Sequence, residues 1–73
     1  MRQKSENLYG DVRGYLCKAI YKGQYEDGEL LPPERKLAEE LGVSRVTVRR
    51  ALELLEQERI ISRVQGSGTR VSL

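Results

Sequence analysis

Apolar positions recur every three to four residues along three segments of the chain and every second residue along the last one. The first segment covers residues 7–22, and its spacing predicts an amphipathic helix. Arg13, Cys17 and Tyr21 are expected on the outer face of this helix, and Gly23 is expected to end it. The positions expected to face the core are Leu8, Val12, Tyr15, Leu16, Ala19 and Ile20.

Two further helical segments follow at about residues 33–41 and 45–58, separated by a very short connection. Pro33 suits the first position of a helix, because the N–H that proline lacks has no partner there. Gly42 can adopt the left-handed conformation that ends a helix, and Ser44 is a predicted N-cap of the third helix. The positions expected to face inward are Leu37, Ala38 and Leu41, then Val48, Ala51, Leu52 and Leu55.

After the third helix the apolar period changes from 3.6 to 2, which predicts short strands. Two such strands flank a glycine-rich turn and form a hairpin over about residues 60–72. Leu30 and Leu31 are candidates for a third short strand, since they precede two prolines. The order of elements predicts a mainly α fold with a small β-hairpin, a three-helix winged helix-turn-helix that occupies residues 1–73.

The connection between the second and third helices has the spacing of a DNA-binding helix-turn-helix. Ala38 is small where two steeply crossed helices must touch, and Gly42 permits the tight turn. Val43 and Val48 are placed to fill the angle between the helices. An ordinary helical hairpin is the alternative, but the full set of residues is more specific than any one of them.

Length and composition exclude several classes of protein. A chain of 73 residues can build only a modest core. Without histidine and with only Cys17, the chain cannot form a His-dependent triad or an ordinary zinc site. The glycines at 66 and 68 do not continue into a dinucleotide-binding motif, because Val71 stands where the third glycine belongs. We therefore expect no enzyme activity, no cofactor and no metal.

The sequence also indicates the cellular compartment of the protein. No apolar run approaches the roughly 20 residues that a membrane span needs. The N-terminal residues lack the apolar stretch of a signal peptide. We expect a cytoplasmic protein that does not bind membranes.

Charge is concentrated in the second half of the chain. The net charge is only +2, but residues 41–73 carry six Arg, three Glu and no Lys. Arg45, Arg49 and Arg50 have no acidic residue among them. Arginine favours bidentate contacts to phosphates and guanine edges, whereas the alternative is a solvated helix face. A winged helix that binds proteins is the rival function, but it calls for apolar anchors, and only Val46 qualifies.

Several motifs together resemble the GntR family of bacterial transcription regulators. The stretch LPPERKLA at 31–38 is similar to the family's LPSERELA signature, and GVSRVTVRRAL at 42–52 is similar to GVSRTTVREAL. GSGTRV at 66–71 resembles the GxGTFV motif of the wing, and residues 8–23 resemble the opening helix. The resemblance implies a winged-helix domain that binds a palindromic operator as a homodimer, in the full-length protein or on DNA.

The resemblance also implies a C-terminal domain that binds a small-molecule effector and thereby changes DNA affinity. We expect that this domain is absent from the chain, and that residues 1–73 are the DNA-binding module of a longer regulator.

Matched position by position, the resemblance implies DNA contacts from both helices of the motif and from the wing. Arg35 matches an arginine that reaches DNA from the second helix, although an ion pair with Glu39 is the alternative. Arg45 and Arg49 match recognition-helix arginines that read guanine edges. The residues that match the wing tip at the minor groove are Gly66, Ser67, Gly68 and Thr69.

Four other positions of the third helix and its cap complete the predicted interface. Ser44 and Thr47 match short hydroxyl residues that contact phosphates, although Ser44 also has its capping role. Val46 replaces a common threonine and offers an apolar contact, such as one to a thymine methyl. Arg50 replaces a frequent glutamate and adds positive charge.

Two departures from the family pattern affect stability. Pro33 replaces the usual serine, so the second helix loses a hydroxyl cap. Arg59 replaces a glycine after the third helix, and a left-handed conformation there costs an arginine roughly 1–2 kcal/mol.

Overall fold

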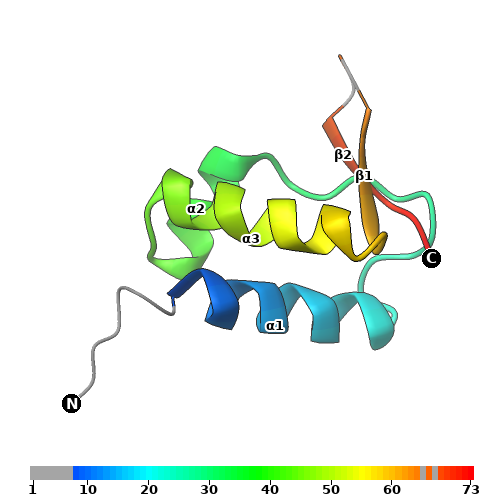
Figure 1. Ribbon diagram of the computed structural model, residues 1–73, viewed down its shortest axis with the longest axis horizontal. Coiled ribbons are helices and arrows are strands. Elements are labelled where there is room, and N and C mark those ends of the chain that lie inside the picture. Colours follow the sequence, from blue (N-terminus) through cyan, green and yellow to red (C-terminus); the bar gives the residue numbers. More distant parts are fainter. Residues whose placement is uncertain (1–7, 65, 67) are drawn as a thin grey trace.

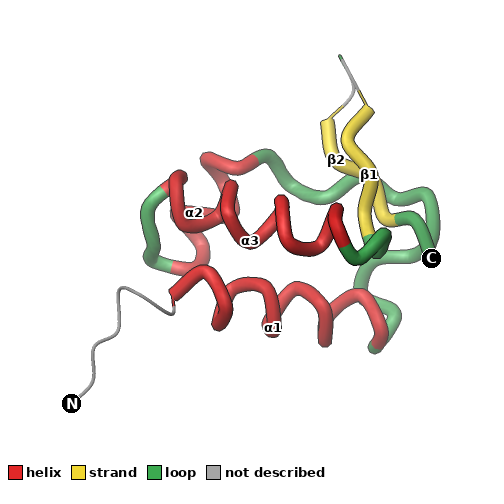
Figure 2. Tube along the Cα trace, viewed as in Figure 1, coloured by secondary structure: helices red, strands yellow, loops and turns green. Residues whose placement is uncertain are grey.

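A computed structural model describes residues 8–64, 66 and 68–73. The first and third helices lie side by side, and the second packs on the third. The hairpin stands at the C-terminal end of the third helix and points away from the first (Figures 1 and 2). All predicted helices and the hairpin are confirmed, each to within one residue at either end. The elements are α1 (Leu8–Tyr21), α2 (Glu34–Leu41), α3 (Arg45–Gln57), β1 (Ile61–Val64) and β2 (Gly68–Val71).

One hydrophobic core joins the three helices to the hairpin. Leu16 of α1 and Leu55 of α3 have no exposed surface, and Ile61 of the hairpin is 1% exposed. The predictions for α1 were wrong at two positions. Tyr15 is 53% exposed rather than inward, and Cys17 is partly buried against the core rather than outward. Both positions lie at the edges of the apolar stripe, where the neighbouring elements decide which side chain is covered.

The turn between α2 and α3 has the predicted geometry. Gly42 is left-handed, with φ 69°, and the N–H of Val43 donates to the carbonyl of Ala38 at 3.1 Å. Ala38 is 7% exposed, and Val48 is fully buried. Because a Cβ is disfavoured at positive φ, glycine at 42 lets α3 leave α2 at the angle that buries these side chains.

Pro33 is the N-cap of α2, so its predicted place at the first helical position was wrong. Its ψ of 159° is extended, and its carbonyl accepts the first helical hydrogen bond from the N–H of Leu37 at 3.0 Å. No side chain caps this end of the helix, which agrees with the predicted loss of a hydroxyl cap.

The hairpin is supported by a third extended segment. Ile61 pairs with Val71 across the two strands, and both side chains are 1% exposed. Leu30 forms an isolated antiparallel bridge with Arg70, and the N–H of Leu31 donates to the carbonyl of Thr69 at 2.8 Å. The predicted third strand is present only as this isolated bridge, because the sheet that the structure describes has two strands, β1 and β2. A lone two-stranded ribbon is marginal in water, so these contacts stabilise the hairpin.

Arg59 adopts a left-handed conformation, with φ 65°. We expect Arg59→Gly to raise the free energy of unfolding by about 0.5–1 kcal/mol, because the relief of strain exceeds the extra chain entropy of glycine. Chemical denaturation measures the change. Arg59→Ala is the control, since it removes the charge and keeps the Cβ; an equal gain in Arg59→Ala would assign the effect to charge.

Arg13 of α1 and Glu58 at the end of α3 form a two-bond ion pair, with Arg13 Nε donating to Glu58 Oε2 at 2.8 Å and Arg13 Nη2 to Glu58 Oε1. The hydrogen bonds from Arg13 lower the pKa of Glu58 below its usual value of 4.5.

Because the pKa of Glu58 is lower in the folded state, the ion pair stabilises the protein at pH values above the unfolded pKa. This contribution disappears as the pH falls through the folded pKa. We expect Glu58→Gln to lower Tm at pH 7 and to have no effect near pH 2, as measured by thermal unfolding; an equal loss at both pH values would contradict the ion pair's role.

Candidate nucleic-acid interface

Helix α3 has one buried face and one exposed face. Val48, Ala51, Leu52 and Leu55 are at most 1% exposed and lock the helix into the core. The opposite face is open to solvent at the predicted recognition residues, which are Arg45, Val46, Arg49 and Arg50. Helix α3 therefore presents its arginines outward, as the sequence predicts.

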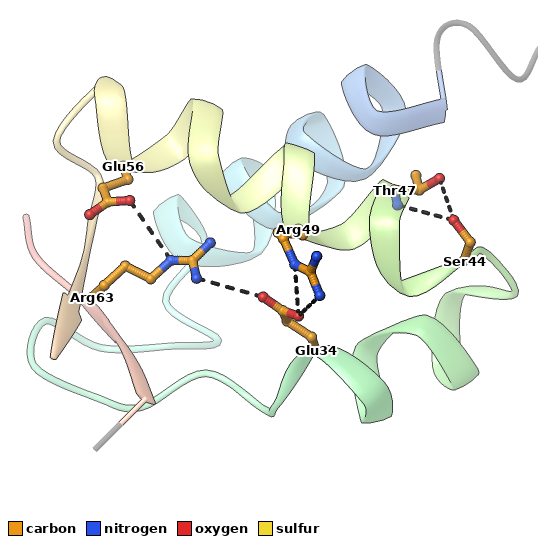
Figure 3. A network of polar contacts seen from close by, with 6 residues as sticks. All are labelled: Glu34, Ser44, Thr47, Arg49, Glu56 and Arg63. Atoms are coloured by element: carbon orange, nitrogen blue, oxygen red, sulfur yellow. Dashed lines mark hydrogen bonds and ion pairs between the residues drawn. The ribbon is translucent and has the colours of Figure 1, made fainter. Parts of the chain in front are cut away.

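The start of α3 is fixed by a hydroxyl cap. Ser44 Oγ accepts from the backbone N–H of Thr47 at 3.1 Å and lies 2.9 Å from Thr47 Oγ1 (Figure 3). The predicted capping role of Ser44 is thereby confirmed. Since the first turn is held in this way, the side chains that follow it have a defined direction.

Substitutions at Ser44 separate capping from DNA contact. Ser44→Ala is expected to lower the free energy of unfolding by about 0.5–2 kcal/mol, whereas Ser44→Gly costs only a few tenths. If the hydroxyl also donates to a phosphate, both variants lose the same DNA affinity despite their different stabilities. Thermal unfolding and DNA titration of the two variants measure this, and unchanged affinity in Ser44→Gly would leave Ser44 as a cap only.

Glu34, the first residue of α2, lies between two arginines (Figure 3). Its Oε1 accepts from Arg49 Nε at 3.4 Å and Nη2 at 3.5 Å, and its Oε2 lies 3.6 Å from Arg63 Nη1. Arg63 Nε is also 3.8 Å from Glu56 Oε1. These ion pairs connect α2, α3 and β1 around one carboxylate.

A groove of about 670 Å³ lies between the starts of α2 and α3 and the hairpin. Arg35 from α2, Arg45 from α3 and Arg63 from β1 line it together with Glu34. Of the residues predicted at the wing tip, Gly66, Gly68 and Thr69 also line the groove. The structure thus brings three separate segments of the predicted site to one surface, and Ser67 lies outside the described residues.

Two further arginines of the predicted interface, Arg49 and Arg50, are not among the residues that line this groove. Arg49 is connected to it through Glu34 and is about half exposed. Arg50 lies away from it, with its guanidinium 5.7 Å from the ring centre of Tyr9 on α1. Among the described residues, no ion pair joins Arg35 to Glu39, so the alternative weighed for Arg35 is not present.

Sequence reasoning missed Glu34 and Arg63 as parts of this surface. The position of Arg63 could have been predicted. It follows Ile61 by two residues, and because strand side chains alternate between faces, the two lie on the same face of the strand. The position of Glu34 could not have been predicted, since its partner Arg49 comes from another helix.

Three helices, a tight helix-turn-helix connection and a hairpin beside an arginine-bearing helix define the class: the chain is a winged-helix DNA-binding domain. No helix in the described part of the chain has the length and apolarity to cross a membrane. Residues 8–71 match the family described as bacterial regulatory proteins, gntR family. The chain belongs to this family, as the motifs predict.

Individual relatives agree with this assignment. The mannosyl-D-glycerate transport/metabolism system repressor MngR of Escherichia coli K12 is 44% identical over 64 residues, which cover 88% of this chain and 27% of the relative. A GntR family transcriptional regulator from Listeria monocytogenes superposes with a TM-score of 0.88 at 34% identity, over 97% of this chain and 62% of that chain.

The DNA-binding domain of AraR, solved in complex with operator ORE1, superposes with a TM-score of 0.89 at 31% identity, over 97% of this chain and 90% of that chain. The fold is therefore one that, in AraR, is seen on operator DNA. The chain spans about a quarter of the length of the curated relatives it matches, with shares of 27% and 26%.

Proposed function

We propose that this chain binds operator DNA sequence-specifically as part of a bacterial transcription regulator, with α3 in the major groove and the hairpin tip at the minor groove. The observation that carries the proposal is the exposed arginine face of α3 next to the groove that leads to the hairpin. In a helix-turn-helix protein the N-terminal part of the second helix reaches base edges first.

The proposed contacts divide into base readout and backbone contacts. Arg45 and Arg49 read guanine edges through two hydrogen bonds each, and Val46 contacts a thymine methyl. The residues assigned to phosphates are Arg35, Ser44, Thr47 and Arg50. The residues assigned to the minor groove are Gly66, Ser67, Gly68 and Thr69.

The regulator's assembly and control are also part of the proposal. Two copies bind a palindromic operator, so that the half-sites are about one helical turn apart. A small molecule that binds another domain of the longer protein controls DNA affinity, which requires that it binds the DNA-competent and DNA-incompetent states unequally. The protein acts in the cytoplasm by binding DNA rather than by catalysis.

Selection of bound duplexes from a random-sequence pool tests this function. We expect inverted repeats of a common half-site, and a log–log slope of affinity against salt near −3.6 if about four phosphates are neutralised. Enrichment of single half-sites would contradict the palindrome, and binding that is insensitive to salt would favour a protein partner. Titration of the full-length regulator with candidate effectors tests its control.

A further inference from the structure

The position of Arg63 on the hairpin follows from strand alternation. Ile61 and Val71 pair on the hairpin face that is buried against the helices. Arg63 pairs with Thr69, two residue pairs farther toward the tip, so its side chain leaves the strand on this same face. At this point the core has ended, and both Arg63 and Thr69 line the groove beside α2 and α3.

The ion pairs of Arg63 are loose. Its guanidinium lies 3.6 Å from Glu34 and 3.8 Å from Glu56, whereas strong charge-assisted hydrogen bonds are about 2.7–2.9 Å long. The side chain is 34% exposed, so water screens both pairs. The two carboxylates therefore orient the guanidinium without using its donors in short hydrogen bonds.

The groove has the charge and location of a path for the DNA backbone. Arg35, Arg45 and Arg63 enter it from α2, α3 and β1. If α3 lies in the major groove and the hairpin tip at the minor groove, the strand between these two grooves must pass between α3 and the hairpin. Arg63 is the arginine on the hairpin side of that path.

We propose that Arg63 binds a backbone phosphate of the DNA, and that Glu34 and Glu56 hold its guanidinium over the groove until DNA arrives. The inference rests on the proposed function, because it needs a duplex on α3. On binding, the phosphate replaces the two distant carboxylates as the partner of the guanidinium, and its oxygens accept two N–H bonds.

Arg63→Gln tests the phosphate contact. Affinity for a short duplex of arbitrary sequence is measured by fluorescence anisotropy between about 0.05 and 0.2 M salt, a range in which phosphate contacts dominate. We expect the log–log slope of affinity against salt concentration to become less steep by about 0.9, and the affinity at 0.1 M salt to fall about eightfold. Both values follow from the loss of one phosphate contact. Arg63→Lys keeps the charge and is expected to retain most of the slope.

Arg70→Gln is the matched control, because it removes the same charge from the opposite face of the hairpin, where the Arg70 guanidinium donates to the Gly28 carbonyl. Equal slopes for Arg63→Gln and Arg70→Gln would overturn the proposal. Loss of salt-dependent binding by the unmodified chain would overturn the proposed function instead. Thermal unfolding verifies that each variant is folded. If Arg63→Gln is not folded, Arg63→Met replaces it, because it removes the same charge and is expected to change the slope by the same amount.

Glu56→Gln tests the exchange of partners. Glu56 contacts Arg63 and not Arg49 among the described residues, so its removal frees only the hairpin arginine. We expect Glu56→Gln to tighten binding two- to fourfold in the unmodified chain and to have no effect in the Arg63→Gln background. An equal gain in both backgrounds would show that Glu56 only repels DNA, and would overturn its role as the partner of Arg63 that the phosphate replaces.

Discussion

Replacement of Arg49 by alanine is expected to weaken binding to the selected operator by about 1–3 kcal/mol, or roughly 5- to 150-fold in Kd. Arg49 lies on the exposed face of α3, and among the described residues its guanidinium donates only to Glu34 Oε1, over the long distances of 3.4 and 3.5 Å. A guanidinium in this position can donate two N–H bonds to O6 and N7 of a guanine. The loss is therefore expected together with a relaxed base preference at one operator position.

Arg49→Lys is the matched control for this prediction. Lysine keeps the charge but lacks the planar fork, so it cannot make the two parallel hydrogen bonds. We expect Arg49→Lys to lose base preference and to keep its affinity for duplexes of arbitrary sequence. If Arg49→Ala weakens operator and arbitrary DNA by the same factor, Arg49 is a phosphate contact and the assignment to base readout is wrong.

Helix positions and the helix-turn-helix connection were predictable because local rules and tertiary packing agree along this chain. The apolar period defined α3, the hydroxyl of Ser44 defined its start, and Gly42 defined the turn before it. The faces of α1 were predicted less well at Tyr15 and Cys17. Both residues lie at the edges of the apolar stripe of α1. Whether a side chain is buried there depends on elements that are distant in the sequence.

The candidate site was predictable to a similar extent. Arginines on the outer face of α3 follow from the helical period alone, once the buried face is known. The contacts of Glu34 with Arg49 and Arg63 do not, because these partners are 15 and 29 positions away in sequence. Their meeting depends on how the hairpin packs beside α2, which no local pattern encodes.

Leu55→Ala is expected to lower the free energy of unfolding by about 2–5 kcal/mol. Leu55 has no exposed surface and belongs to the core cluster that joins the helices to the hairpin. A domain of this size is expected to be stable by roughly 4–11 kcal/mol, so the variant loses a large part of its stability. At 4–8 °C per kcal/mol, Tm falls by roughly 10–40 °C in thermal unfolding followed by circular dichroism.

Leu73→Ala is the control for Leu55→Ala, because it makes the same chemical change at a side chain that is 60% exposed. Its effect is expected to stay within about 0.5 kcal/mol.

Leu55 and Arg49 lie on opposite faces of the same helix, so their variants should have opposite effects on Tm and on DNA affinity. Leu55→Ala loses Tm and keeps DNA affinity wherever it is folded, and operator DNA restores part of the lost Tm by mass action. Arg49→Ala keeps Tm and loses DNA affinity. If Leu55→Ala lost operator affinity while fully folded, the two faces of α3 would not be separable into a packing face and a reading face.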